Sequence, residues 1–238
     1  MMMATTVLSL LLSAAAVTAA PEPTGVVRAY SELGGKPYTV GYDARSLLVG
    51  GSRLLSLSGS FHYVRSTPRM WPSIFASMKA SGLNTVDSYV FWNYHVRTNS
   101  SADRTHPDYS GRGNVTQFLQ LAAEADMFVI WRIGPYINAE WLDGGYPAWV
   151  KNECHDTGIR KAAQPYMDLT TEWMTSHVST VRKFFASEGG PIILLQMDNE
   201  LGGATPEYLA FLAGLAKKLQ PGIPWTMCHG AHFNGSLL

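Results

Sequence analysis

Charged residues and cysteines are scarce in this sequence of 238 residues. Only 15% of the residues are charged, and 18 Lys and Arg balance 18 Asp and Glu, so the formal net charge is zero. A general nucleic-acid binder usually carries a basic excess, and we therefore expect no nucleic-acid partner. Because 46% of the residues are hydrophobic, the composition is typical of a globular protein and argues against disorder.

Several functional motifs are also missing. The two cysteines, Cys154 and Cys228, are too few for a disulfide scaffold and lack zinc-ligand spacing, and the sequence leaves open whether they pair. The seven histidines form no H-E-x-x-H motif, which favours core or surface histidines over metal ligands. There is no G-x-G-x-x-G after a strand and no P-loop, so nucleotide binding lacks its usual support. Without a G-x-S-x-G elbow, a Ser-His-Asp hydrolase is not indicated.

The first twenty residues differ from the rest of the chain. The apolar run from Val7 to Ala20 ends in small residues before Pro21 and is too short for a comfortable membrane span. It resembles the apolar region and cleavage site of a signal peptide, although residues 1–6 lack Lys and Arg. We therefore expect residues 1–20 to direct the chain into the secretory pathway, with no other membrane contact. Extracellular, cell-wall and lysosomal or vacuolar proteins share this kind of leader. Sequons of the N-x-S/T type fit this route and occur at Asn99, Asn114 and Asn234.

Strands and helices alternate along the rest of the sequence. Apolar and β-branched segments predict five strands, at residues 54–63, 84–92, 128–136, 192–197 and 224–228. Amphipathic segments predict four helices, at residues 67–82, 115–123, 166–185 and 205–219. Thr67 and Thr205, each followed by Pro, are predicted N-caps. Long loops are expected at residues 93–113 and 137–165.

This alternation predicts an α/β fold with a parallel sheet. Polar and aromatic residues crowd the carboxyl end of successive predicted strands, which favours a (β/α)8 TIM barrel over a doubly wound sheet. A complete barrel takes about 250 residues, so we expect an incomplete barrel with about the first five β/α units. We assign residues 54–238 to this partial catalytic barrel. Residues 21–53 form an N-terminal segment with short strands near residues 38–42 and 46–49.

The fourth predicted strand ends in the polar tripeptide Asp198-Asn199-Glu200. A carboxyl group at a barrel mouth, flanked by apolar strand residues, is partly desolvated, and its raised pKa suits a general acid near neutral pH. Glu200 is therefore the first catalytic candidate, and Asn199 is placed to hydrogen-bond a substrate hydroxyl. A simple turn is the alternative, because Asp-Asn is common turn chemistry.

Glu140 is the second candidate carboxylate, in a segment that follows the third predicted strand and contains Asn138 and Trp141. Two carboxylates on neighbouring strands suit acid/base or glycosyl-transfer chemistry. The alternative is that Glu140 only binds nearby backbone amides.

Two further pairs are more ambiguous. His62 and Tyr63 end the first predicted strand, where they either line the pocket or form a satisfied pair in the core. Asp87 and Asp198 lie near strand ends, and we interpret both as structural.

Three blocks of sequence resemble family 35 of the glycoside hydrolases, the β-galactosidase family. The blocks are G-S-F-H-Y-V-R-S-T-P-R-M-W at 59–71, R-I-G-P-Y-I-N-A-E-W-L-D-G-G-Y-P-A-W at 132–149 and G-G-P-I-I-L-L-Q-M-D-N-E-L-G at 189–202. The resemblance covers roughly residues 54–228. It implies a barrel of the glycoside hydrolase type that removes terminal β-D-galactose from the non-reducing end of galactosides or galactans by a retaining mechanism.

Site roles follow from the resemblance, motif by motif. Glu200 would be the proton donor and later the general base. Contacts to galactose would come from Tyr63, Asn138, Ala139 (through its backbone), Glu140 and Asn199. No metal or organic cofactor is implied, and the oligomeric state is left open.

The sequence departs from the family pattern near the acid/base. Asp198 and Leu201 stand where the family more often has Glu and an aromatic residue. The family's nucleophilic Glu lies well downstream of the acid/base, whereas here only Glu207 follows Glu200, near the start of a predicted helix. We therefore expect the chain as given to lack the nucleophile. The alternative function is a non-catalytic galactoside-binding protein or an inert truncated product.

Overall fold

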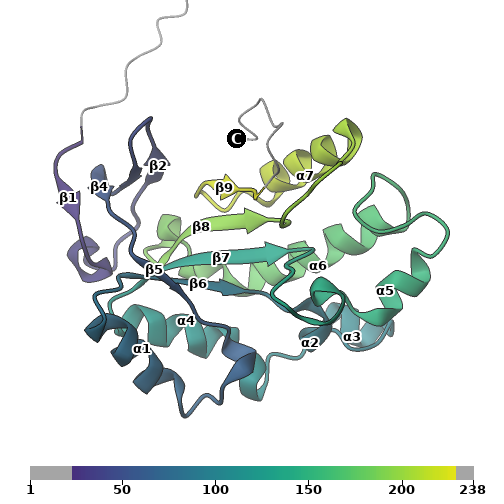
Figure 1. Cartoon of the computed structure of the whole chain (residues 1–238), viewed down its shortest axis with the longest axis horizontal. Coiled ribbons are helices and arrows are strands. Elements are labelled where there is room, and N and C mark those ends of the chain that lie inside the picture. The colour runs from purple at the N-terminus through teal and green to yellow at the C-terminus, as the bar shows by residue number, and fades with distance from the viewer. Residues whose placement is uncertain (1–22, 229–238) are drawn as a thin grey trace, which may run out of the picture.

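The computed structural model describes residues 23–228 and contains two β-sheets with helices around the larger one (Figure 1). The predicted signal peptide and the sequon at Asn234 lie outside the described residues. Five parallel strands form the larger sheet, in the order β5-β6-β7-β8-β9. Their bounds are β5 Ser58–Ser60, β6 Thr85–Tyr89, β7 Phe128–Gly134, β8 Ile192–Met197 and β9 Trp225–Thr226.

The order of these strands decides between the two candidate architectures. Each strand pairs with the next one along the chain, whereas a doubly wound sheet reverses its order partway. Four main helices alternate with the strands, and each packs on the next: α1 Trp71–Ala80, α4 Val115–Glu124, α6 Tyr166–Val181 and α7 Pro206–Leu219. A sequential parallel sheet with a ring of helices is a partial (β/α) barrel, which confirms the predicted fold class.

The two faces of the parallel sheet differ in burial. Side chains alternate across a strand, and the buried set includes Val86, Trp131 and Leu195, which face the helices. The alternate positions are mostly half-buried, and they include charged groups such as Asp87 and Arg132. The hydrophobic core therefore lies between the sheet and the helices, and the opposite face carries the polar groups.

The predicted long loops contain short helices. These are α2 Trp92–His95, α3 Ser101–Thr105 and α5 Ala148–Glu153, with 3-10 turns at Gly111–Gly113 and Leu142–Gly145. Periodicity misses elements of four to six residues, because one turn of helix shows no repeat. Among residues 23–228, no helix combines the length and the hydropathy that a membrane span needs.

The smaller sheet covers the amino ends of the parallel strands, opposite the arrowheads of β7 and β8 in Figure 1. Its order is β1-β4-β3-β2, with bounds β1 Val26–Val27, β2 Val40–Tyr42, β3 Leu47–Val49 and β4 Ser52–Leu54. A 3-10 turn, Tyr30–Leu33, lies between β1 and β2. The hydroxyls of Tyr30 and Tyr38 donate to the carbonyls of Gly189 and Gly190, at 2.6 and 2.7 Å. These bonds attach the small sheet to the segment that leads into β8.

The prediction of one strand over residues 54–63 is wrong. Leu54 belongs to β4 in the small sheet, and only Ser58–Ser60 pairs with β6. Between them, the Asn84 side chain accepts from the Leu57 N–H at 2.9 Å and donates to the Leu55 carbonyl at 3.0 Å. The Asn84 side chain thus supplements the backbone hydrogen bonds to the Leu57 carbonyl where the chain crosses from one sheet to the other.

The two predicted N-caps have different outcomes. The Thr205 hydroxyl accepts from the N–H of Tyr208 at 3.3 Å and caps α7, as predicted. Thr67 caps no helix: its carbonyl accepts from the Met70 N–H in a separate turn, and α1 begins only at Trp71. The same Thr-Pro signal therefore starts a helix in one place and a turn in the other.

Candidate active site

The sequence-predicted site residues follow the carboxyl ends of three parallel strands. Tyr63 follows β5, the segment 138–140 follows β7, and Asn199 and Glu200 follow β8. The ends of β7 and β8 lie side by side, because the Asp198 N–H donates to the Gly134 carbonyl at 2.8 Å. Parallel-barrel enzymes place their chemistry at this edge.

Left-handed backbone conformations mark both strand ends. Asn138, Ala139 and Glu140 have φ values of 55°, 60° and 45°, and Asp198 and Glu200 have 54° and 45°. Such values are uncommon outside glycine and cost free energy, so surrounding contacts must hold these turns. Strained backbone of this kind gathers at functional sites. Both turns present exposed carboxylates, on Glu140 and Glu200, so the partial desolvation predicted for Glu200 is not observed in this structure.

Arg65 supports the first of these turns. Its Nη2 donates to the Ala139 carbonyl at 2.6 Å, and its guanidinium lies 5.2 Å from the centre of the Trp141 ring. The Trp141 Nε1 in turn donates to the side chain of Asn93 at 3.0 Å. The segment that carries Ala139 is therefore anchored to the residues that follow β5 and β6.

Arg132 lies beneath the same segment, on the polar face of the sheet. Its Nη1 donates to the Ile137 carbonyl at 3.1 Å, and its guanidinium stacks 3.6 Å from the centre of the Tyr89 ring. Asp87 lies 3.9 Å from its Nη2. Burial raises the pKa of the Asp87 carboxyl, and the charge of Arg132 opposes that rise. Asp87 thus balances a guanidinium in the sheet, in keeping with its predicted structural role.

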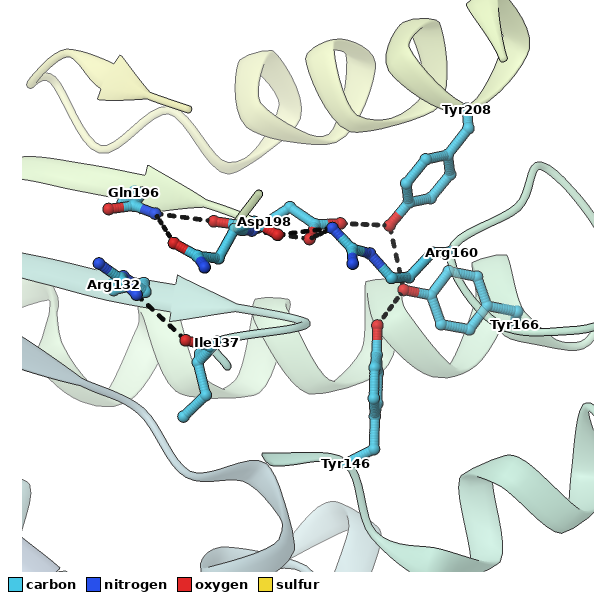
Figure 2. Close-up of polar contacts among 9 residues, drawn as sticks. Arg132, Ile137, Tyr146, Arg160, Tyr166, Gln196, Asp198 and Tyr208 are labelled. Atoms are coloured by element: carbon cyan, nitrogen blue, oxygen red, sulfur yellow. Dashed lines mark hydrogen bonds and ion pairs between the residues drawn. The ribbon is translucent and has the colours of Figure 1, made fainter. Parts of the chain in front are cut away.

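Asp198 is the centre of a buried network beside Glu200 (Figure 2). Its side chain is fully buried, and Arg160 Nη2 donates to its Oδ1 at 2.7 Å. The Asn199 N–H also donates to Oδ1 at 2.7 Å, and the Tyr208 hydroxyl donates to Oδ2 at 2.9 Å. Burial raises the pKa of Asp198, while Arg160 and these hydrogen bonds act against the rise. The structural role predicted for Asp198 fits this geometry.

Tyrosine hydroxyls extend the network away from the strand end. Tyr208 and Tyr166 are joined at 3.0 Å, and Tyr166 and Tyr146 at 2.5 Å. All three side chains are fully buried, and burial raises the pKa of each phenol above its ordinary value. The chain of hydroxyls connects α7, α6 and the loop after β7 to the Asp198 turn.

Asn199 lies within the protein rather than on its surface. Its side chain is 4% exposed, and its Oδ1 accepts from Gln196 Nε2 at 3.1 Å. Gln196 Nε2 also donates to the Asp198 carbonyl at 2.9 Å. With Oδ1 engaged, the amide NH₂ of Asn199 is the group that remains to donate to a ligand.

The structure corrects the prediction that Tyr63 contacts the sugar. Its side chain is 0% exposed, and its hydroxyl accepts from the Phe91 N–H at 3.2 Å and bonds His95 Nε2 at 2.7 Å. The chain turns into a 3-10 helix at Tyr63–Arg65, which directs the ring into the core against Trp131. The satisfied core position, left open by the sequence, is the one observed for Tyr63.

Arg65, Arg160 and the three tyrosines of the network were not predicted as site residues. Arg65 lies inside the first of the resembling blocks, so that signal was available. Arg160, Tyr166 and Tyr208 come from a loop and two helices far apart in sequence, and no local pattern links them. The cysteines are unpaired, with Cys154 buried and Cys228 exposed. Across residues 23–228, no group of three His, Cys, Asp or Glu side chains gathers as in a metal site.

Comparisons with known proteins place most of the chain in one family. The family model described as Glycosyl hydrolases family 35 matches residues 46–229. The chain is 41% identical over 196 residues to Probable beta-galactosidase 2 of Dictyostelium discoideum, which covers 79% of this chain and 25% of the relative. It is 38% identical over 208 residues to Beta-galactosidase 14 of Arabidopsis thaliana, which covers 84% of this chain and 23% of the relative. The chain thus spans about a quarter of the length of these curated relatives.

A solved structure supports the fold separately. The endo-1,4-beta-mannanase from Rhizomucor miehei matches with a TM-score of 0.59 at 15% sequence identity, over 83% of this chain and 62% of that one. At this identity the similarity shows the fold alone.

Proposed function

This chain belongs to glycosyl hydrolase family 35, and from that membership we propose that it builds the acid/base side of a β-galactosidase active site. The observation that carries the proposal is the pair of strained turns at the ends of β7 and β8. They bring two exposed carboxylates, Glu140 and Glu200, together with the amide of Asn199 at one edge of the sheet. The ligand is a terminal, non-reducing β-D-galactosyl unit.

Glu200 acts first as proton donor to the glycosidic oxygen and then as general base toward water. Asn199 donates its amide to a galactose hydroxyl, and Glu140 accepts from another. Asn138 and the backbone of Ala139 complete the contacts. Tyr63 has no contact role here, because its ring lies in the core.

Retention of configuration requires a second carboxylate about 5–5.5 Å from the first. The one carboxylate that follows Glu200 in the sequence is Glu207, which lies in the first turn of α7 and is exposed. Its hydrogen bonds with its own backbone and with Thr205 lower its pKa, as expected for an N-terminal helix residue. We therefore propose that the sequence as given supplies the acid/base half of a retaining site, without the nucleophile.

Two measurements on the chain test this function. We expect isothermal titration calorimetry to show binding of D-galactose in preference to D-glucose, and Glu140→Gln to weaken that binding by about tenfold through loss of a charged hydrogen-bond acceptor. We expect no release of nitrophenol from a nitrophenyl β-galactoside. A folded chain that binds no galactose would contradict the proposed site.

Turnover would be informative in another way. If the chain hydrolyses the galactoside and Glu200→Gln abolishes this activity, Glu200 is confirmed as the acid/base. The chain must then also contain a nucleophile, and Glu140 becomes the candidate. Galactose binding without turnover would support the half-site and equally fit a galactoside-binding protein. A longer coding sequence with a further strand that ends in Glu would then favour the hydrolase.

We also propose that the chain enters the secretory pathway, on the basis of the leader at residues 1–20 and the exposed sequon at Asn99. Asn114 is half-buried, and its side chain accepts from the Gln117 N–H at the start of α4. We expect glycosidase treatment to lower the mass of the secreted protein by removing a glycan from Asn99. The Asn99→Gln variant should show no such change in mass. Protein retained in the cytosol without glycan would contradict this route.

A further inference from the structure

Arg160 contacts the chain after both strands that carry the proposed galactose contacts. Its Nη2 donates to Asp198 Oδ1 at 2.7 Å and to the Asn199 carbonyl at 2.6 Å, in the turn after β8. Its guanidinium carbon lies 4.2 Å from the centre of the Tyr136 ring, in the loop after β7. One side chain thus bridges the two halves of the site.

Arg160 itself comes from a third part of the chain, the segment between α5 and α6. The residues that follow it, Lys161 and Ala162, are exposed, whereas the Arg160 side chain is 21% exposed and reaches inward. Its own φ is 58°, so its backbone adopts the left-handed conformation as well. Such a conformation needs compensating contacts, and those of Arg160 all go to the site.

Asp198 holds the guanidinium in place. Its carboxylate is fixed by the Asn199 N–H and by the Tyr208 hydroxyl, which is fixed in turn by Tyr166. The pair of Arg160 and Asp198 also balances one positive charge with one negative charge in a buried setting. The guanidinium is therefore held in the position from which it donates to the Asn199 carbonyl.

We propose that Arg160 is a positioning residue of the galactoside site, which aligns the Asp198–Glu200 turn with the loop that carries Asn138–Glu140. The nature of the ligand rests on the proposed function, whereas the alignment rests on the contacts of Arg160. Small misplacements of binding groups have large effects on ligand recognition, so a residue that touches no ligand still sets affinity.

The guanidinium geometry is specific to arginine. Its planar group stacks on Tyr136 while the edge donates to two oxygens, and a lysine ammonium is a point charge that cannot lie flat on a ring. We therefore expect Arg160→Lys to restore part of the function that Arg160→Met loses.

The test measures the affinity of the whole chain for D-galactose by calorimetry. We expect Arg160→Met to bind about tenfold more weakly than the unmodified chain, and Arg160→Lys to fall between the two. The matched control is Arg104→Met. Arg104 donates to Glu172 at 3.1 and 2.5 Å and is 32% exposed, but it joins α3 to α6 on the helix ring. Its loss should leave galactose affinity unchanged.

Removing Arg160 alone leaves the Asp198 charge buried and unpaired, so a second variant guards against unfolding. Arg160→Met with Asp198→Asn removes both charges. The amide oxygen of the new Asn side chain still accepts from the Asn199 N–H, and its NH₂ group donates to the oxygen of the Tyr208 hydroxyl. We expect this double variant to fold and still to bind weakly. Affinity equal to that of the unmodified chain would overturn the proposal.

A spectroscopic measurement separates this inference from the proposed function. In Arg160→Met and the double variant, we expect the amide ¹H–¹⁵N resonances of Ala139, Glu140, Asn199 and Glu200 to shift, and not in Arg104→Met. If the chain binds no galactose at all, the proposed function fails, and these resonances still decide the role of Arg160. Unchanged resonances at both strand ends would refute the alignment.

Discussion

At the scale of single residues, three arginines share one mode of contact. Arg65, Arg132 and Arg160 each donate to a carbonyl oxygen in or next to a strained turn, and each stacks on an aromatic ring. A left-handed turn of non-glycine residues persists only when its surroundings over-determine it. A guanidinium supplies a charge-assisted hydrogen bond and a flat packing surface together, which explains why arginine recurs at these turns.

Tyr63 provides a residue-level prediction. We expect Tyr63→Phe to lower the free energy of unfolding by about 1–3 kcal/mol, because the Phe91 N–H and His95 Nε2 would lose a buried partner. Galactose affinity should stay unchanged, since the ring lies in the core. Urea unfolding and calorimetry on the same preparation check both parts. Weaker galactose binding at full stability would instead assign Tyr63 to the ligand.

At the scale of elements, the small sheet is attached where the backbone of Gly190, just before β8, lies close to the backbone of Phe184. A Cβ atom on Gly190 would meet the backbone of Phe184 at 2.2 Å, so no larger residue fits without a shift. The Gly190 carbonyl also accepts from the hydroxyl of Tyr38. The glycine thus allows the end of the helical segment after α6, the start of β8 and the small sheet to meet.

We expect Gly190→Ala to destabilise the fold by several kcal/mol, as overpacking against a rigid backbone does. Gly214 is the matched control: it lies inside α7, and a Cβ there meets nothing within 4 Å. Because Ala favours a helix interior over Gly, Gly214→Ala should stabilise the chain by up to about 1 kcal/mol. Thermal unfolding of both variants gives the comparison. Equal midpoints for the two would refute the close approach at Gly190.

At the scale of the whole molecule, buried histidines make the stability of the fold depend on pH. His95 Nδ1 donates to the Asp108 carbonyl at 2.8 Å, because a carbonyl can only accept. Burial disfavours a second proton on the ring, so the ring is neutral and Nε2 accepts from the Tyr63 hydroxyl. Burial lowers the pKa of His95 to about 4 and that of His177 well below its ordinary value. His177 is likewise enclosed, with Trp131 Nε1 donating to it at 3.0 Å.

The sign of the pH effect follows from these shifts. Between about pH 6.5 and pH 4 the unfolded chain binds a proton at His95 and the folded chain does not, so stability falls as the pH falls. The raised pKa values of Asp87 and Asp198 act in the opposite direction. The contribution of one histidine is therefore best isolated by a variant.

We expect His95→Gln to reduce the slope of unfolding free energy against pH in this window by roughly 1.4 kcal/mol per pH unit, the share of one histidine. Urea unfolding at several pH values from 7 to 5 measures the slope. His155→Gln is the control, because that side chain is 85% exposed. Identical slopes for the His95 variant and the unmodified chain would contradict a buried, neutral His95.

The sequence by itself determined the parallel α/β fold and the two candidate strand ends. Apolar runs such as residues 192–197 and helical stripes such as residues 115–123 are local, and each is fixed by side chains within one element. The blocks around Glu140 and Glu200 are equally local, so their place after β7 and β8 could be predicted. The outline of the fold and the position of both carboxylates required no knowledge of distant contacts.

Only the tertiary structure decided what those local patterns become. Tyr63 follows β5 and could have lined the site, but its side chain lies in the core, where its hydroxyl bonds His95, thirty-two residues away in the sequence. Arg160 reaches Asp198 and Asn199 across thirty-eight and thirty-nine residues of sequence. Hydrogen bonds and ring contacts of this range depend on how the chain closes in space. Periodicity along one element contains no information about them, which is why the support of the site emerged only from the folded chain.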